Sequence, residues 1–172
     1  SFAECRTAHP TAASRVHVSC AIDIPKAPPG PVQFQTFQRR ICLDVQSPST
    51  YLWARIRSLG NLLLEIGRRT GDVDTPLAQT VLVGAGQTVP TVIGIECCVD
   101  KETGVLAAWR PLGLTTGPKV SVTTEIIGGG RFGLASEATL MPGQQLPLPG
   151  ASFVFANLIA TRVAGDCKAC AL

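Results

Sequence analysis

The feature that most constrains the fold of this chain is an alternation of apolar and polar residues with a period of two. It is clearest from Arg15 to Ile24, where every even-numbered position is apolar and most odd-numbered positions are polar. Successive side chains of a β-strand point to opposite faces, so this pattern is typical of a half-buried strand. We therefore expect one set of residues to be more buried than the other: Val16, Val18, Cys20 and Ile22, compared with Arg15, His17 and Ser19.

Further strand-like segments follow, separated by turns rich in proline and glycine. The apolar positions change parity after Phe34, which predicts a bulge or a short turn near Thr36 to Arg40. The segments 91–99 and 105–110 flank a polar connection that ends in Gly104. A connection of this kind between two apolar runs predicts an antiparallel hairpin.

Residues 51–69 fit both a helical and a strand periodicity. Gly60 and Asn61 lie at the centre of this segment, and an internal glycine costs a helix up to ~1 kcal/mol. The favoured interpretation is a short helix or strand up to residue 59, a turn at Gly60 and Asn61, and a strand over residues 62–67.

These segments amount to roughly eight to ten short strands in a chain of 172 residues, which is the size of one domain. The expected fold is mainly β: a single-domain β-sandwich of jelly-roll or Greek-key type with at most one or two short helices. We expect an N-terminal extension over residues 1–14, the β-sandwich domain over 15–165 and a C-terminal tail over 166–172. No apolar run approaches the roughly 18 residues of a membrane span, so none is predicted.

The surface has few charges. Charged residues make up 16% of the chain, against roughly 25% in an average globular domain. The mean hydropathy is +0.26. Such a chain is expected to cover part of its surface with copies of itself or related subunits. The apolar residues expected on that surface lie in or beside loop-like segments: Leu106, Leu112, Leu114, Leu146 and Leu148.

Positive charge is concentrated between residues 39 and 69, where six arginines stand against Asp44 and Glu65, six minus two, or +4. Guanidinium groups suit carboxylate and phosphate ligands. The favoured interpretation is strand-edge solubility, so we expect that the six arginines do not all share one face. The alternative is an anion-facing or RNA-facing stripe. The residues of the candidate stripe are Arg39, Arg40, Arg55, Arg57, Arg68 and Arg69.

No motif predicts catalysis or a cofactor. Gly128, Gly130 and Gly133 match the spacing of a dinucleotide fingerprint, but no helix signal or acidic residue follows at the required place. His17 is expected to be an ordinary solvated histidine. The pairs Asp72/Asp74 and Asp100/Glu102 are interpreted as turn chemistry. The prediction is therefore a protein that is not an enzyme, with no catalytic residue and no cofactor.

The chain contains seven cysteines, an odd number, so at least one thiol has no partner within the monomer. Cys167 and Cys170 form a C-x-x-C pair without a second pair at zinc-site spacing, and no metal site is predicted. Cys97 and Cys98 are adjacent on a strand and should face opposite sides. Most cysteines are expected to be core thiols made in a reducing cytoplasm.

Two functions remain. The first is a structural, self-assembling subunit, of which a jelly-roll viral coat protein in a virion or other assembled particle is the favoured example, with RNA as a further partner through the arginine stripe. The alternative is a secreted or surface-exposed β-sandwich module, either a pilus-like subunit or a ligand-binding domain, with some cysteines in disulfides. Architecture alone does not establish either function.

Overall fold

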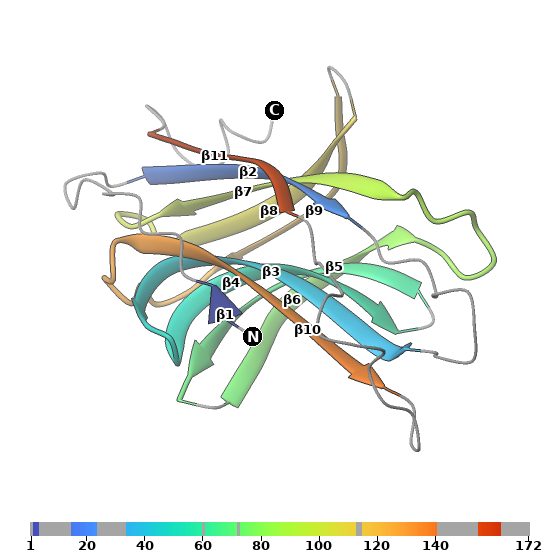
Figure 1. The fold of residues 1–172 in the computed structure, drawn as a ribbon. Helices are drawn as coiled ribbons and strands as arrows, with labels where there is room; N and C mark the ends of the chain where they lie inside the picture. Colours follow the sequence, from blue (N-terminus) through green and yellow to red (C-terminus); the bar gives the residue numbers. More distant parts are fainter. Residues whose placement is uncertain are drawn as a thin grey trace.

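The computed structural model describes residues 2–3, 15–23, 34–59, 61–71, 73–112, 115–140 and 155–162. Within these residues the chain consists of strands, turns and irregular connections, with no helix. The strands form two antiparallel sheets that face each other (Figure 1). The mainly β, two-layer sandwich expected from the alternation is confirmed.

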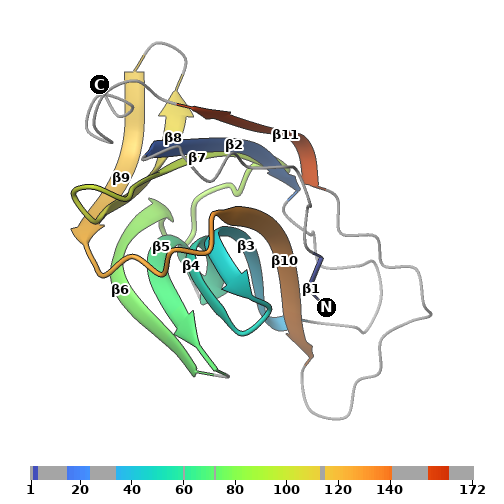
Figure 2. The same cartoon turned by 90° about the vertical axis from the view of Figure 1, so that its left-hand side faces the viewer.

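One sheet has six strands in the order β1-β10-β3-β4-β5-β6, and the other has five in the order β11-β2-β7-β8-β9. The six-stranded sheet curves strongly, with β6 and β10 on its two sides (Figure 2). Its strands are β1 (Phe2–Ala3), β3 (Phe34–Ser47), β4 (Thr50–Leu59), β5 (Asn61–Thr70), β6 (Val73–Val83) and β10 (Arg131–Leu140). The strands of the five-stranded sheet are β2 (Arg15–Asp23), β7 (Val92–Asp100), β8 (Val105–Leu112), β9 (Thr115–Thr123) and β11 (Phe155–Arg162).

Apolar side chains from both sheets fill the space between them. On β2 the even-numbered residues from Val16 to Ile22 are buried and the odd-numbered ones from Arg15 to Ala21 are not fully buried, which confirms the predicted alternation. The strands β7 and β8 pair from Glu96↔Trp109 to Asp100↔Val105, which confirms the predicted hairpin. The common core therefore follows directly from period-two patterning.

The ambiguous segment 51–69 forms two paired strands rather than a helix. Strands β4 and β5 pair continuously from Thr50↔Thr70 to Leu59↔Asn61. Their inward residues, including Leu52, Ile56 and Leu64, are completely buried against the opposite sheet. The strand alternative was correct. On β4 the residues Leu52, Ala54 and Ile56 face the core and those between them face outward, which is the period of a strand.

The irregularity predicted near Thr36 is present: the pairing of β3 with β10 shifts register between Phe34 and Thr36. A second change of parity, which was not predicted, lies at Asp44, which has a positive φ of 49°. The pairing between β3 and β4 shifts register there, between Leu43 and Ser47. Leu106, expected beside a loop, is a fully buried core residue of β8, whereas Leu112 is 46% exposed; Leu114, Leu146 and Leu148 lie outside the described residues.

The N-terminal extension predicted over residues 1–14 contains strand β1, which pairs with β10 through Phe2↔Ala135 and Ala3↔Leu134. The predicted tail over residues 166–172 lies outside the described residues. In the part of the chain that the structure describes, no helix could span a bilayer.

Candidate functional site

The outer face of the six-stranded sheet, turned away from the sandwich core, carries a cluster of charged and aromatic side chains. On β4 the odd-numbered residues point outward, since Leu52, Ala54 and Ile56 belong to the core. Cross-strand neighbours on β3, β5 and β6 add further polar side chains at the same level. We call this surface the arginine face and define it by Arg40, Tyr51, Trp53, Arg55, Arg57, Glu65, Arg69 and Asp74.

Glu65 is the first anchor of the arginine face. Its side chain has no solvent exposure. Arg55 Nε donates a hydrogen bond of 2.6 Å to one carboxylate oxygen, and Arg57 Nη2 donates one of 2.7 Å to the other. Arg55 Nη1 also donates to the Gln38 side chain at 2.8 Å. A buried carboxylate therefore holds two guanidinium groups on neighbouring positions of the sheet.

Asp74 is the second anchor. Arg40 donates to both of its carboxylate oxygens, at 2.9 Å from Nη1, in the fork geometry that suits a carboxylate. Arg69 Nη1 donates at 3.2 Å, and Arg55 Nη1 lies 3.5 Å away. Asp74 was expected to make a turn, which was wrong: it lies on β6 and joins three arginines from β3, β4 and β5.

Trp53 forms the floor of the arginine face. The Arg55 guanidinium carbon lies 4.2 Å from the ring centroid, and that of Arg40 lies 5.8 Å away, both within cation–π range. A Cβ atom at Gly67 would come within 2.3 Å of the Trp53 ring, so only glycine leaves room for the indole there. The indole Nε1 is buried and has no hydrogen-bond partner among the described residues.

The arginine face has a buried base and a more accessible rim. Trp53 and Glu65 are 0% exposed, and Arg40 and Arg55 are 3% and 5% exposed. Side-chain exposure rises to 29% at Arg57, 23% at Arg69 and 21% at Asp74.

Charge on the arginine face does not balance. Four arginines and two carboxylates give four minus two, or +2. Burial, opposed mainly by the hydrogen bond to Glu65, lowers the pKa of Arg55. For Arg40, burial also lowers the pKa, but the hydrogen bond and charge of Asp74 outweigh it and the pKa is raised. Arginine pKa values start so high that both groups remain cations at neutral pH.

The six arginines of the predicted stripe divide between two sides of the sheet. Arg40, Arg55, Arg57 and Arg69 converge on the arginine face. Arg39 lies at the level of Ile56 on the inward side of β3 and is 1% exposed. Arg68 lies on the inward side of β5 and pairs with Glu125 at 3.5 Å. Whether the converging arginines bind an anion or RNA stays a prediction.

The outer face of the five-stranded sheet carries separate polar pairs instead of one cluster of arginines. His17 Nε2 lies 3.0 Å from a Glu96 carboxylate oxygen, and its ring stacks on Trp109 with centroids 5.7 Å apart. His17 was expected to be solvated, and it is instead held between these two groups. Arg15 Nε donates to Asp100 at 2.9 Å, while Asp100 also accepts the backbone N–H of Glu102, as expected for a turn residue.

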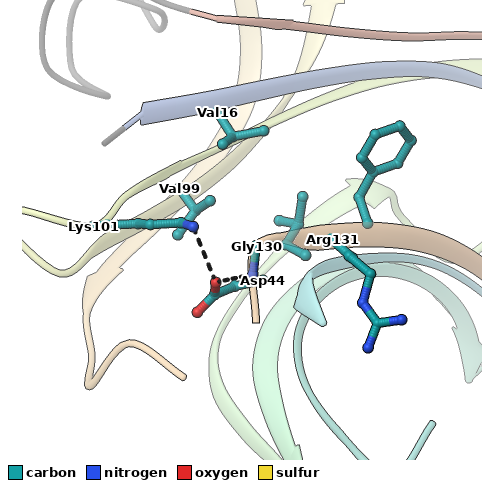
Figure 3. A pocket seen from close by; sticks show the side chains of 8 residues that line it. Val16, Asp44, Val99, Lys101, Gly130 and Arg131 are labelled. Atoms are coloured by element: carbon teal, nitrogen blue, oxygen red, sulfur yellow. Dashed lines mark hydrogen bonds and ion pairs between the residues drawn. The ribbon is translucent and has the colours of Figure 1, made fainter. Parts of the chain in front are cut away.

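The glycine-rich segment that resembled a dinucleotide fingerprint binds a carboxylate of its own chain. The Asp44 side chain accepts backbone N–H bonds from Ile127, Gly128 and Gly130 at 2.6–3.1 Å. Lys101 approaches the same carboxylate at 3.4 Å, as Figure 3 shows, and Arg131 points away from it. The pocket beside them has a volume of about 10 Å³, room for about one water molecule. These N–H groups are therefore not available to a phosphate.

Cysteines in the described residues are of two kinds. Cys20, Cys42 and Cys97 are free and buried, and burial raises the pKa of Cys20 to about 11 and that of Cys42 to about 12. Cys97 points into the core while the adjacent Cys98, on the outer side of β7, is disulfide-bonded. No group of metal-ligating residues occurs among the described residues; Cys5, His9, Cys167 and Cys170 lie outside them.

Comparison with known proteins finds similarity in fold but not in sequence. No protein-family model and no curated protein matches the chain. Among solved structures, the carbohydrate binding module CBM66 from Bacillus subtilis is similar, with a TM-score of 0.55, 10% identity, and coverage of 85% of this chain and 73% of that one. A single mutant of congerin II has a TM-score of 0.44 and 11% identity over 82% of this chain and 95% of that one. The similarity to the Bacillus module supports the β-sandwich fold.

Proposed function

We propose that this chain is a non-catalytic binding module and that a carbohydrate binds on the arginine face. The observation that carries the proposal is the concentration of Trp53, four arginines and two carboxylates on one outer sheet face. The charged side chains of an ordinary solvated surface are exposed, whereas Arg40, Arg55 and Glu65 are more than nine-tenths buried. Such fixed groups suit recognition, because they lose little freedom when a ligand binds.

The groups at the rim match the chemistry of sugar hydroxyls. A hydroxyl both donates and accepts hydrogen bonds, and the rim offers the carboxylate of Asp74 next to the guanidinium groups of Arg69 and Arg57. A similar fold is found in a protein named as a carbohydrate binding module. The fold similarity and the rim chemistry together favour carbohydrate as the ligand class.

The arrangement argues for binding without catalysis. General acid–base catalysis needs a side chain within hydrogen-bond reach of the reacting group. Glu65 has no solvent exposure, and both of its oxygens accept from arginines. Asp74 likewise accepts from Arg40 at both oxygens. The two carboxylates are thus committed to holding the arginines in place.

A glycan array followed by titration calorimetry tests the proposal, with two neighbouring arginines as a matched pair. Arg69→Ala removes a rim residue of the arginine face, whereas Arg68→Ala removes the same charge from the inward side of the same strand. We expect Arg69→Ala to weaken glycan binding roughly 10-fold, the loss of one charge-assisted hydrogen bond, and Arg68→Ala to leave it unchanged. Equal effects of the two variants, or no glycan bound at all, would refute the proposal.

Assembly with copies of the chain is a second candidate function. Val73 and Val81 lie on β6, the edge strand of the six-stranded sheet, and are 65% and 47% exposed. Edge strands with exposed apolar side chains can pair with another chain. Native mass spectrometry should then show an oligomer that Val81→Lys dissociates, and a monomer at high concentration would exclude this function.

For location, we propose a secreted or surface-exposed protein. The disulfide at Cys98 supports this over a reducing cytoplasm. Peptide mapping of native protein should recover Cys98 in a bridge, while Cys20 and Cys42 are alkylated only after unfolding, since thiolates are the reactive form and burial raises both pKa values. Recovery of Cys98 as a free thiol from its natural source would contradict the proposal.

A further inference from the structure

We infer that the ligand carries an acidic group, a carboxylate or a sulfate ester, and that Arg57 binds it at one end of the arginine face. This inference rests on the proposed function and adds the charge of the ligand to it. It starts from Arg57, whose hydrogen-bond donors are only partly used by the described residues. A cation at a partly desolvated surface attracts anions more strongly than the same charge in open water.

The arginines of the face differ in how many of their hydrogen-bond donors are used. Arg40 directs both terminal nitrogens to Asp74, and Arg55 directs Nε to Glu65 and Nη1 to Gln38. Arg57 makes one hydrogen bond to the described residues, from Nη2 to Glu65.

Its Nε is buried and has no partner among the described residues. A guanidinium group has five N–H donors in a planar fork, so Arg57 retains most of its donors. An unpartnered buried donor destabilises the free protein, and an incoming oxyanion that accepted a hydrogen bond from it would remove that penalty. The side chain is also the most exposed arginine of the face, at 29%. Arg57 is therefore the group best placed to receive an anionic ligand.

The other end of the face has the opposite character. Asp74 is a partly exposed carboxylate at the level of Arg69 and Tyr51. Its negative charge repels an acidic group but not a neutral hydroxyl. Tyr51 and Arg57 are six residues apart on β4, or about 20 Å at the rise of a strand. The two ends thus suit an extended oligomer with hydroxyls at one end and an acidic group at the other.

An RNA ligand is less compatible with this arrangement. Binding to a phosphate backbone depends on several cations that neutralise successive phosphates. Here Glu65 and Asp74 lie among the arginines and already accept most of their hydrogen bonds. We therefore expect RNA to bind more weakly than an acidic oligosaccharide.

The test compares matched oligosaccharides that differ only in charge, titrated into the whole chain by calorimetry. One pair is oligogalacturonate and its methyl ester, and another is a sulfated heparan oligosaccharide and its desulfated form; poly(U) is included as an RNA probe. We expect at least one acidic member to bind about 10- to 100-fold more tightly than its neutral partner, the range for a charge-assisted contact.

Variants assign that preference to Arg57. Arg57→Gln should bring the acidic and neutral members to similar affinity, and Arg57→Lys, which keeps the charge but loses the fork, should retain part of the difference. Lys119→Gln removes an exposed charge from the five-stranded sheet and should change nothing. Circular dichroism confirms that each variant is folded.

Each outcome is decisive. An acidic preference that Arg57→Gln abolishes supports the inference. Neutral oligosaccharides that bind as well as acidic ones, or a preference that survives Arg57→Gln, overturn it while leaving the proposed function intact. Tight binding of poly(U) with no acidic oligosaccharide bound overturns it in favour of RNA. If no oligosaccharide or RNA binds, the proposed function fails and the inference fails with it.

Discussion

Each outer face of the sandwich carries one of the two tryptophans of this chain, and the side chains that surround them differ. On the six-stranded sheet, Trp53 lies beneath the guanidinium groups of Arg40 and Arg55. On the five-stranded sheet, Trp109 stacks on His17, which is bound to Glu96.

The two faces also differ in charge balance. Four arginines share two carboxylates on the first face, whereas on the second Arg15 lies between the carboxylates of Asp100 and Glu102. Both networks hold their sheet surface in a fixed geometry. Only the first contains a partly exposed arginine, Arg57, with a buried donor that has no partner among the described residues. This difference distinguishes a surface suited to binding from one that is internally balanced.

The largest expected effect that separates the two faces is on stability. Glu65→Gln would leave the buried Arg55 without its charged partner, and breaking a buried ion pair in this way costs about 3–5 kcal/mol. The matched change on the other face is Glu96→Gln, where the pair with His17 is 28% exposed on the glutamate side. Its loss should cost no more than about 1 kcal/mol. Urea unfolding measures both, and similar losses would break the distinction between a buried and a surface network.

A second pair of variants tests how tightly each face is packed. In Gly67→Ala the new Cβ would lie 2.3 Å from the Trp53 ring and 2.5 Å from the Thr75 carbonyl oxygen. Overpacking of this kind costs about 1–3 kcal/mol. Gly94 lies on the outer side of β7, and a Cβ there would meet Pro111 at an ordinary 3.5 Å, so Gly94→Ala should be close to neutral. A neutral Gly67→Ala in thermal unfolding would show that Trp53 can move.

The smallest expected effect is an acid-dependent loss of stability that originates on the five-stranded face. Burial of Asp100 raises its pKa, but hydrogen bonds from Arg15, Thr103 and Glu102 outweigh burial and hold the pKa below its usual value. A pKa that is lower in the folded than in the unfolded state gives stability that is present above the unfolded value of about 3.9 and is lost as the pH falls through the folded value. Stability curves at pH 2–5 should therefore be flatter for Asp100→Asn than for the natural chain. Curves of identical slope would assign the acid sensitivity to other carboxylates.

The fold could be predicted largely because burial imposes a period of two. The alternation on β2 and the hairpin from β7 to β8 follow from local sequence alone. The bulge of β3 near Thr36 also follows from the change of parity after Phe34. The second irregularity of β3, at Asp44, could not be predicted, because it depends on Asp44 binding backbone N–H groups more than eighty residues away. That contact is invisible to local periodicity.

The arginine face was only partly visible in the sequence. The prediction that the six arginines do not all share one face was correct, since Arg39 and Arg68 belong to the opposite side of the sheet. It did not show that the other four converge. The role of Asp74 depends on the register between β5 and β6, which places it opposite Arg69. The alternation of Trp53, Arg55 and Arg57 on β4 was the signal that could have predicted a shared face.

The most direct test of the central claim uses the two tryptophans as reporters of the two faces. A two-dimensional ¹H–¹⁵N spectrum of this chain should contain two indole Nε1–H signals, one from each face, which Trp53→Phe assigns. During titration with the tightest-binding oligosaccharide from the array, the Trp53 signal should shift in a saturable manner while the Trp109 signal stays in place. A saturable shift of Trp109 with Trp53 unchanged would place the ligand on the five-stranded sheet and contradict the account.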